Sequence, residues 1–144
     1  MIIDSQNLLS DAQALTASAA STNIVDLGSD RNIGIGKSMA VVITVDVAAD
    51  GTTTDETYTF AVQADDNAAF SSAANVVSRT IGYASLTAGS QHVLPIPPDT
   101  SMERYLRLYA TLGGTTPSVT ITADLKPMDM IQNDGVYPKN YPIQ

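Results

Sequence analysis

Residues 39–64 read MAVVITVDVAADGTTTDETYTFAVQA and contain two stretches in which apolar side chains alternate. Every odd position from Met39 to Val47 is apolar, and so is every even position from Tyr58 to Ala64. A period of two residues is typical of a strand that buries one face. Asp50-Gly51 between them is a hairpin signal, although the loop is longer than two residues. The stretch therefore predicts two antiparallel strands joined by a turn.

Further strand patterns occur on both sides of this stretch. They cover residues 22–27, 76–83, 91–96, 103–112 and 118–125. Residues 68–74 are predicted to form one helical turn, capped by Asp66 and held against the core by Phe70. No stretch predicts a helix of three turns, which argues against an α/β fold. Seven or eight short strands, each with one apolar face, predict an all-β antiparallel β-sandwich of jelly-roll type.

The two ends of the chain depart from this pattern and predict arms on either side of one sandwich domain, residues 21–126. Residues 1–20 are rich in Ala, Ser and Gln, and they have few large apolar side chains. One interpretation is a short amphipathic helix, and the favoured one is an extended N-terminal arm with one helical turn. Residues 127–144 contain three prolines among large apolar side chains. Because a disordered tail is poorer in such groups, they predict a C-terminal arm ordered against its own body or a partner.

The apolar residues of both arms are the predicted arm contacts, since an extended arm can add a strand to the sheet of a neighbour. These residues are Ile2, Ile3, Leu8, Leu9, Leu15, Met130, Ile131, Tyr137, Tyr141 and Ile143.

The composition excludes several functional classes. The 144 residues include no Cys and one His, which excludes disulfides, thiolate chemistry and His-rich metal sites. Fifteen acidic against seven basic residues, a net charge of −8, argue against nucleic-acid binding. No apolar run is long enough to predict a membrane span, and the first residues have no targeting signal. A chain of this length can bury a core without a metal.

None of the short motifs predicts a catalytic, metal or cofactor site. Residues 31–38, RNIGIGKS, lack the first glycine of a phosphate-binding loop and precede a strand instead of a helix. His92 is interpreted as a half-buried strand residue. Asp50, Asp55 and Glu56 lack the spacing of a calcium loop, so solvated turn residues are expected. The absence of Trp argues against a glycosidase cleft and weakens a lectin interpretation.

Residues 103–109, ERYLRLY, suggest an interaction surface. If Leu106 faces the core, Tyr105, Arg107 and Tyr109 share the opposite face of the strand. Tyr and Arg are enriched at interface hot spots, whereas a solvated sheet face carries Thr, Lys and Glu more often. The three residues are therefore a candidate interface. The alternative is that a tail or connection of the same subunit covers them.

The order and spacing of several segments resemble one known family. These are residues 1–7 (MIIDSQN), 10–15 (SDAQAL), 21–28 (STNIVDLG), 31–34 (RNIG), 65–70 (DDNAAF), 94–98 (LPIPP), 103–108 (ERYLRL) and the Tyr-Pro pair at 137–138. Together they resemble the capsid cement, or decoration, proteins of short-tailed bacteriophages such as the Bordetella phages. The resemblance extends over nearly the whole chain.

This resemblance implies a structural virion protein without enzymatic activity or cofactor. It would be made in the cytoplasm of the bacterial host, bind the outer capsid surface, and cement neighbouring major capsid protein subunits against the pressure of the packaged genome. The expected partners are the major capsid protein and a second copy of the chain, with a homodimer favoured over a trimer. The alternative is a carbohydrate-binding jelly-roll module, such as a head fibre or adhesin.

Overall fold

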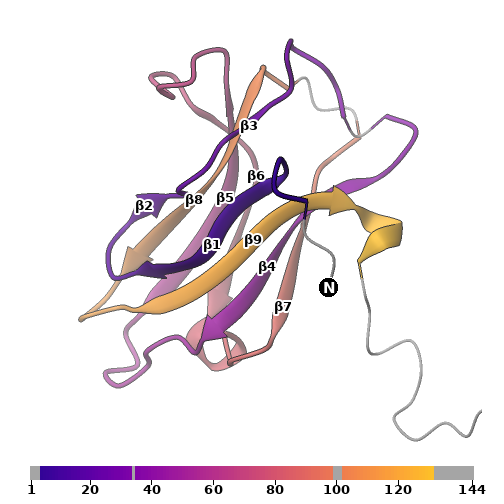
Figure 1. Cartoon of the computed structure of the whole chain (residues 1–144). Helices are drawn as coiled ribbons and strands as arrows, with labels where there is room; N and C mark the ends of the chain where they lie inside the picture. Colours follow the sequence, from indigo (N-terminus) through magenta and orange to yellow (C-terminus); the bar gives the residue numbers. More distant parts are fainter. Residues whose placement is uncertain (1–3, 34, 99–101, 132–144) are drawn as a thin grey trace, which may run out of the picture.

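The chain folds into two antiparallel sheets packed face to face (Figure 1). The computed structural model describes residues 4–33, 35–98 and 102–131. Its strands are β1 (Leu8–Leu15), β2 (Ala19–Ala20), β3 (Val25–Asp26), β4 (Met39–Val47), β5 (Thr57–Asp65), β6 (Ala74–Gly82), β7 (Gln91–Pro95), β8 (Tyr105–Gly113) and β9 (Val119–Pro127). Two short 3-10 turns, η1 (Tyr83–Ser85) and η2 (Met128–Met130), follow β6 and β9.

The order of the strands is that of a jelly roll. Sheet A has the order β1-β9-β4-β7, and sheet B has the order β2-β8-β5-β6, with β3 also paired to β8. Because β2 and β3 pair with successive parts of β8, they act as one interrupted edge strand. Counted in this way, sheet A contains the first, eighth, third and sixth strands, and sheet B the second, seventh, fourth and fifth. This arrangement confirms the predicted jelly-roll β-sandwich.

The core lies between the two sheets and is formed by one side of each long strand. In β4 it takes Val41, Ile43 and Val45, and in β5 it takes Tyr58 and Phe60. The phenol of Tyr58 is buried and donates to the carbonyl oxygen of Asp50 at 2.8 Å. The alternation predicted from residues 39–64 is therefore confirmed as the inner face of both strands, except at Val47, which follows a register shift and is 59% exposed.

The predicted pairing of these two strands through the Asp50-Gly51 turn is wrong. β4 lies between β9 and β7, whereas β5 lies between β8 and β6 in the other sheet. The connection crosses from one sheet to the other and is held by its own polar groups, since Asp50 accepts from the Thr52 backbone amide at 3.1 Å. Alternation shows which face of a strand is buried, and it does not show which sheet the strand joins.

The prediction that residues 1–20 form an arm is wrong for the described part from residue 8. Residues 8–15 are strand β1, paired with β9 of the same chain, and residues 19–20 are β2. Two irregularities interrupt the register of β1, between Leu8 and Ser10 and between Ser10 and Gln13, and Ala12 has φ +43°. Such bulges shift side chains from one face to the other, so the period of two residues is lost from the sequence. The domain therefore begins before the predicted boundary at residue 21.

Three smaller differences concern the ends of the strands. The predicted strand at residues 22–27 is limited to β3. Residues 68–74 form turns and the start of β6 instead of a helical turn. β9 continues to Pro127, and η2 follows it directly. Residues 132–144 of the predicted C-terminal arm, together with the predicted contacts Ile2, Ile3, Tyr137, Tyr141 and Ile143, lie outside the described residues.

Candidate functional site: two outer sheet faces

The outer face of sheet B carries the predicted interface residues together. Along β8, Leu106 and Leu108 are buried in the core, while Tyr105, Arg107 and Tyr109 alternate with them and are half-buried. The three side chains therefore lie on the side of the sheet that faces away from the core, as the alternation predicts. We call this set, with Phe70, the aromatic–arginine face.

Arg107 is held at the centre of this face by an amide and two aromatic rings. Its Nε donates to Oε1 of Gln63 on the neighbouring strand β5 at 2.8 Å. The guanidinium carbon lies 4.3 Å from the centre of the Phe70 ring and 5.3 Å from that of Tyr109. Asn75 on β6 accepts from the amide of Gln63 at 3.0 Å and so fixes the orientation of that side chain. These contacts hold the planar cation over the sheet.

Phe70 reaches the aromatic–arginine face because Asp65 shapes the connection between β5 and β6. The buried carboxylate of Asp65 accepts from the backbone amides of Asn67 at 2.9 Å and Ser72 at 2.7 Å. The pKa of Asp65 is lowered, chiefly by the hydrogen bond from Asn67. Phe70 itself has φ +53° and is 8% exposed. It is buried against Arg107 and not in the core, which corrects the prediction for this residue.

Of the two interpretations of Tyr105, Arg107 and Tyr109, the covering by the same subunit is met in part, and the interface stays a prediction. A connection of the same subunit does cover Arg107 through Phe70. All three side chains nevertheless keep an intermediate exposure, so a partner can still reach them. The sequence reasoning missed Phe70 and Gln63, because their position depends on which strands become neighbours of β8.

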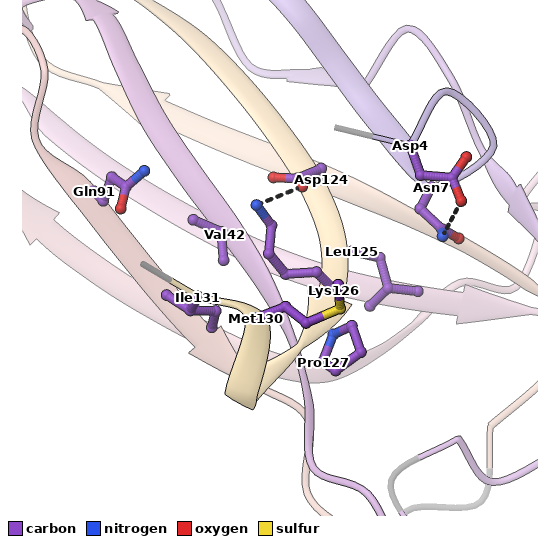
Figure 2. Close-up of a pocket in the computed structure, with 10 residues that line it drawn as sticks. All are labelled: Asp4, Asn7, Val42, Gln91, Asp124, Leu125, Lys126, Pro127, Met130 and Ile131. Atoms are coloured by element: carbon purple, nitrogen blue, oxygen red, sulfur yellow. Dashed lines mark hydrogen bonds and ion pairs between the residues drawn. The ribbon is translucent and has the colours of Figure 1, made fainter. Parts of the chain in front are cut away.

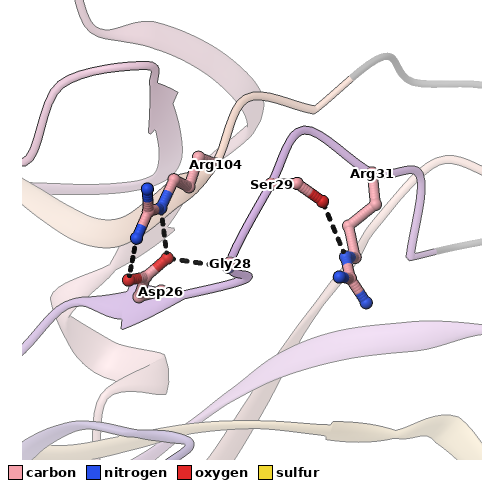
Figure 3. Close-up of polar contacts among 5 residues, drawn as sticks. All are labelled: Asp26, Gly28, Ser29, Arg31 and Arg104. Atoms are coloured by element: carbon pink, nitrogen blue, oxygen red, sulfur yellow. Dashed lines mark hydrogen bonds and ion pairs between the residues drawn. The ribbon is translucent and has the colours of Figure 1, made fainter.

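An exposed ion pair lies beside the aromatic–arginine face (Figure 3). Arg104 donates to both carboxylate oxygens of Asp26, with Nε–Oδ1 at 2.7 Å and a second contact at 2.9 Å. The Gly28 amide donates to the same carboxylate at 2.7 Å. The hydrogen bond from Arg104, aided by that of Gly28, lowers the pKa of Asp26 to about 2. The Arg104 guanidinium also lies 4.9 Å from the centre of the Tyr105 ring.

The outer face of sheet A is hollowed instead of flat. A cavity of about 290 Å³ opens there (Figure 2). It is lined by Asp4, Asn7, Val42, Gln91, Asp124, Leu125, Lys126, Pro127, Met130 and Ile131. Nζ of Lys126 lies 2.8 Å from Oδ2 of Asp124, and the two side chains are 11% and 4% exposed. The cavity therefore combines apolar walls with a nearly buried ion pair.

The chain itself closes one side of this cavity. η2 follows β9 and places Met130 and Ile131 at the cavity wall. It is attached to the segment before β4, because the Met128 amide donates to the Ser38 carbonyl at 2.8 Å and Lys37 pairs with Asp129 at 3.1 Å. Met130 and Ile131, predicted as contacts with a neighbour, thus lie against their own sheet, although Met130 is 60% exposed.

The predicted contacts at the other end belong to the sandwich. Leu9 and Leu15 are 1% and 3% exposed in the core, and Leu8 is half-buried in β1. The sequence reasoning also missed the Asp124–Lys126 pair. The sequence contained a sign of this pair, because Asp124 and Lys126 are two residues apart at the end of a predicted strand and side chains at that spacing lie on the same face.

Among the remaining candidates, Glu56 is 5% exposed, so the expectation that it is a solvated turn residue is wrong. Within residues 4–33, 35–98 and 102–131, no group of three His, Asp or Glu side chains could hold a metal ion. His92 has its Nε2 3.2 Å from the Ser90 hydroxyl and 3.0 Å from the Ser85 carbonyl, and burial lowers its pKa. Among the residues that the structure describes, no helix has the length and apolar character needed to cross a membrane.

The strand order and the two outer faces define a jelly-roll β-sandwich whose distinctive features are surfaces. The chain belongs to the Bbp16 family, a Bordetella phage protein family, whose model matches residues 9–124. This match confirms the resemblance to a Bordetella phage protein family that the sequence indicated. Family membership indicates a phage structural protein and suggests a location in the virion.

Two further comparisons add little. No curated protein matches the chain. A crystal structure of PirA is similar at 10% sequence identity and a TM-score of 0.38, covering 81% of this chain and 95% of that chain. A likeness at that level carries no argument about function.

Proposed function

We propose that the protein is a capsid cement protein. It binds the outer surface of a phage capsid and links neighbouring major capsid protein subunits, so that the shell withstands the pressure of the packaged genome. The observation that carries this proposal is the membership of the Bbp16 family over residues 9–124. The protein acts by binding alone and needs no cofactor, nucleic acid or membrane.

The physical features of the chain suit such a role. β1 completes sheet A from within the chain, so the subunit can fold before it meets the shell. A net charge of −8 keeps the free subunit soluble and away from nucleic acid. We further propose that the binding unit is a homodimer, because two linked sites can exceed the affinity of one by roughly 10²–10⁴-fold. The aromatic–arginine face is the proposed contact surface with the shell.

Binding to empty shells tests this function directly. Shells assembled from the major capsid protein alone are mixed with the purified protein and sedimented. Saturable binding at a fixed ratio to the capsid protein is expected, and decorated shells should keep packaged DNA to a higher temperature than bare shells. Analytical ultracentrifugation of the free protein reports whether it is a dimer.

A glycan array serves as the opposing measurement. Absence of shell binding together with clear binding of a glycan would overturn the cement proposal and favour a carbohydrate-binding module. Shell binding without a fixed ratio, and without any effect on DNA retention, would also contradict it.

A further inference from the structure

Arg107 differs from three other cations of the chain in how its charge is held. Lys37, Arg104 and Lys126 each form an ion pair with a carboxylate. Arg107 is held instead by the neutral amide of Gln63 and by the ring of Phe70. Among the described residues, no carboxylate lies within ion-pair distance of its guanidinium. Within this part of the chain, its positive charge is therefore anchored in position without a neutralising carboxylate.

Two acids that pair in register with Tyr105 are already engaged. Asp65, which pairs in register with Tyr105, is 1% exposed and accepts hydrogen bonds from the Asn67 and Ser72 amides. Asp26 is held by Arg104 at the end of the strand. In a chain with 15 acidic and seven basic residues, Arg107 is therefore a half-buried cation that is not paired with a carboxylate among the described residues.

We infer that Arg107 is the anchor of the shell-binding surface and that it receives a carboxylate side chain from the shell protein. This inference rests on the proposed function and names the chemistry of its partner. A guanidinium has five N–H donors in a planar fork, and Gln63 uses one of them. A carboxylate can accept two of the remaining donors side by side, and this bond is stronger at a half-buried site than in water.

The aromatic neighbours make the same site suitable for a protein partner. Phe70 and Tyr109 lie against Arg107 and supply rigid apolar surface around the charge. Arginine and tyrosine within such a rim are the residues that carry most of the energy at interfaces. The carboxylate gives the contact its direction, and the rings exclude water from it.

A second copy of this chain fits the face less well. In a two-fold dimer the same patch meets itself, so a contact centred on this face would bring two Arg107 side chains together. Two like charges in a partly desolvated contact oppose binding. A different protein that offers Asp or Glu has no such conflict.

The test compares three variants of the full-length protein for binding to shells of the major capsid protein. Arg107→Lys keeps the charge but loses the planar fork, and Arg107→Gln loses the charge. Arg79→Gln is the control for loss of one positive charge, because Arg79 is an exposed arginine of β6 that pairs in register with the core residue Phe60 and so lies on the other side of the same sheet. It donates to the Val93 carbonyl oxygen at 3.5 Å. Dissociation constants are measured at about 50 mM and about 300 mM salt, where screening differs strongly. Unfolding curves of all variants verify that each is folded.

We expect Arg107→Lys to weaken shell binding roughly 10-fold and Arg107→Gln more strongly, in the range of a hot-spot residue. Arg79→Gln should stay within about twofold of the unmodified protein. Arg107→Gln should also show a smaller loss of affinity at high salt, because the screened ion pair is gone. Restored binding of Arg107→Glu to shells in which one surface acid is replaced by Lys would identify the partner residue.

Two results would overturn the inference while leaving the proposed function intact. One is shell binding of Arg107→Gln that equals that of the unmodified protein. The other is loss of the homodimer in Arg107→Gln with unchanged binding per subunit, which would make a second copy the occupant of this face. A failure of the unmodified protein to bind shells would instead contradict the proposed function itself.

Discussion

The outer faces of the two sheets each carry one cation, and the two cations differ in the groups that hold them. On sheet A, the cation Lys126 lies beside Asp124 at 2.8 Å, nearly buried at the edge of a cavity that η2 helps to line. On sheet B, the cation Arg107 is held by an amide and aromatic rings and remains half-exposed. Within the described residues, Lys126 has a carboxylate partner on the first face and Arg107 has none on the second. The comparison therefore contrasts a cation whose partner lies in its own sheet with one that we propose binds a partner from the shell.

The largest effect is expected from removing β1, the edge strand of sheet A. Deleting residues 1–15 takes Leu9 and Leu15 out of the core and leaves β9 as an open edge. Loss of one buried leucine typically costs about 2–5 kcal/mol, so two approach the whole stability of a small domain. Circular dichroism should show a chain without cooperative unfolding. Replacing the exposed Asp11 by Ala is the control and should leave unfolding unchanged. A stable truncated protein would restore the arm interpretation.

The next effect is expected at the ion pair of sheet A. Asp124→Asn leaves the nearly buried Lys126 without its partner and should lower the free energy of unfolding by about 3 kcal/mol. The double replacement Asp124→Leu with Lys126→Met removes both charges and should lie within about 1 kcal/mol of the unmodified protein. Urea unfolding measures both values. If Asp124→Asn were as stable as the unmodified protein, Lys126 would be solvated in the variant without loss of folding free energy.

A change on sheet B should separate binding from stability. Tyr109→Ala removes half-exposed surface, so the free energy of unfolding should fall by less than about 1 kcal/mol. Binding to shells should weaken by about 1–3 kcal/mol, the range of a hot-spot residue. Unfolding curves and shell sedimentation of the same preparation give the two quantities. Unchanged binding would show that the aromatic–arginine face is covered by its own subunit in the assembled shell.

The smallest effect is expected from pH at the exposed pair beside sheet B. The pKa of Asp26 is about 2 in the folded protein, below its ordinary value of 3.8. A lowered pKa adds stability above pH 4, and this contribution is lost as the pH falls from about 4 towards 2. Asp26→Asn should therefore unfold with a weaker dependence on pH over that interval. Because the pair is exposed, water and salt keep the difference small. Identical pH profiles of both proteins would contradict the assignment.

Local patterns were sufficient for the fold class but not for the pairing of strands. The alternation in residues 39–64 is a property of the chain itself, since the side chains of a strand point to opposite faces whatever lies beside it. Which strands become neighbours depends on contacts between distant parts of the chain. For this reason β4 and β5 separate into different sheets despite the turn signal between them. β1 was missed because its bulges remove the alternation on which the reasoning relied.

The sequence by itself determined the sandwich, its jelly-roll type, the family, and the alternation that sets Tyr105, Arg107 and Tyr109 apart from the core. All of these follow from short-range order or from the succession of segments along the chain. Only the tertiary structure decided that Phe70 and Gln63 hold Arg107, and that Asp124 and Lys126 pair at a cavity. The partners of Arg107 come from the connection after β5 and from β5 itself, whose positions beside β8 exist only in the folded chain. Whether a charged side chain has an oppositely charged partner depends on its neighbours in space, and the packing of the sheets determines those neighbours.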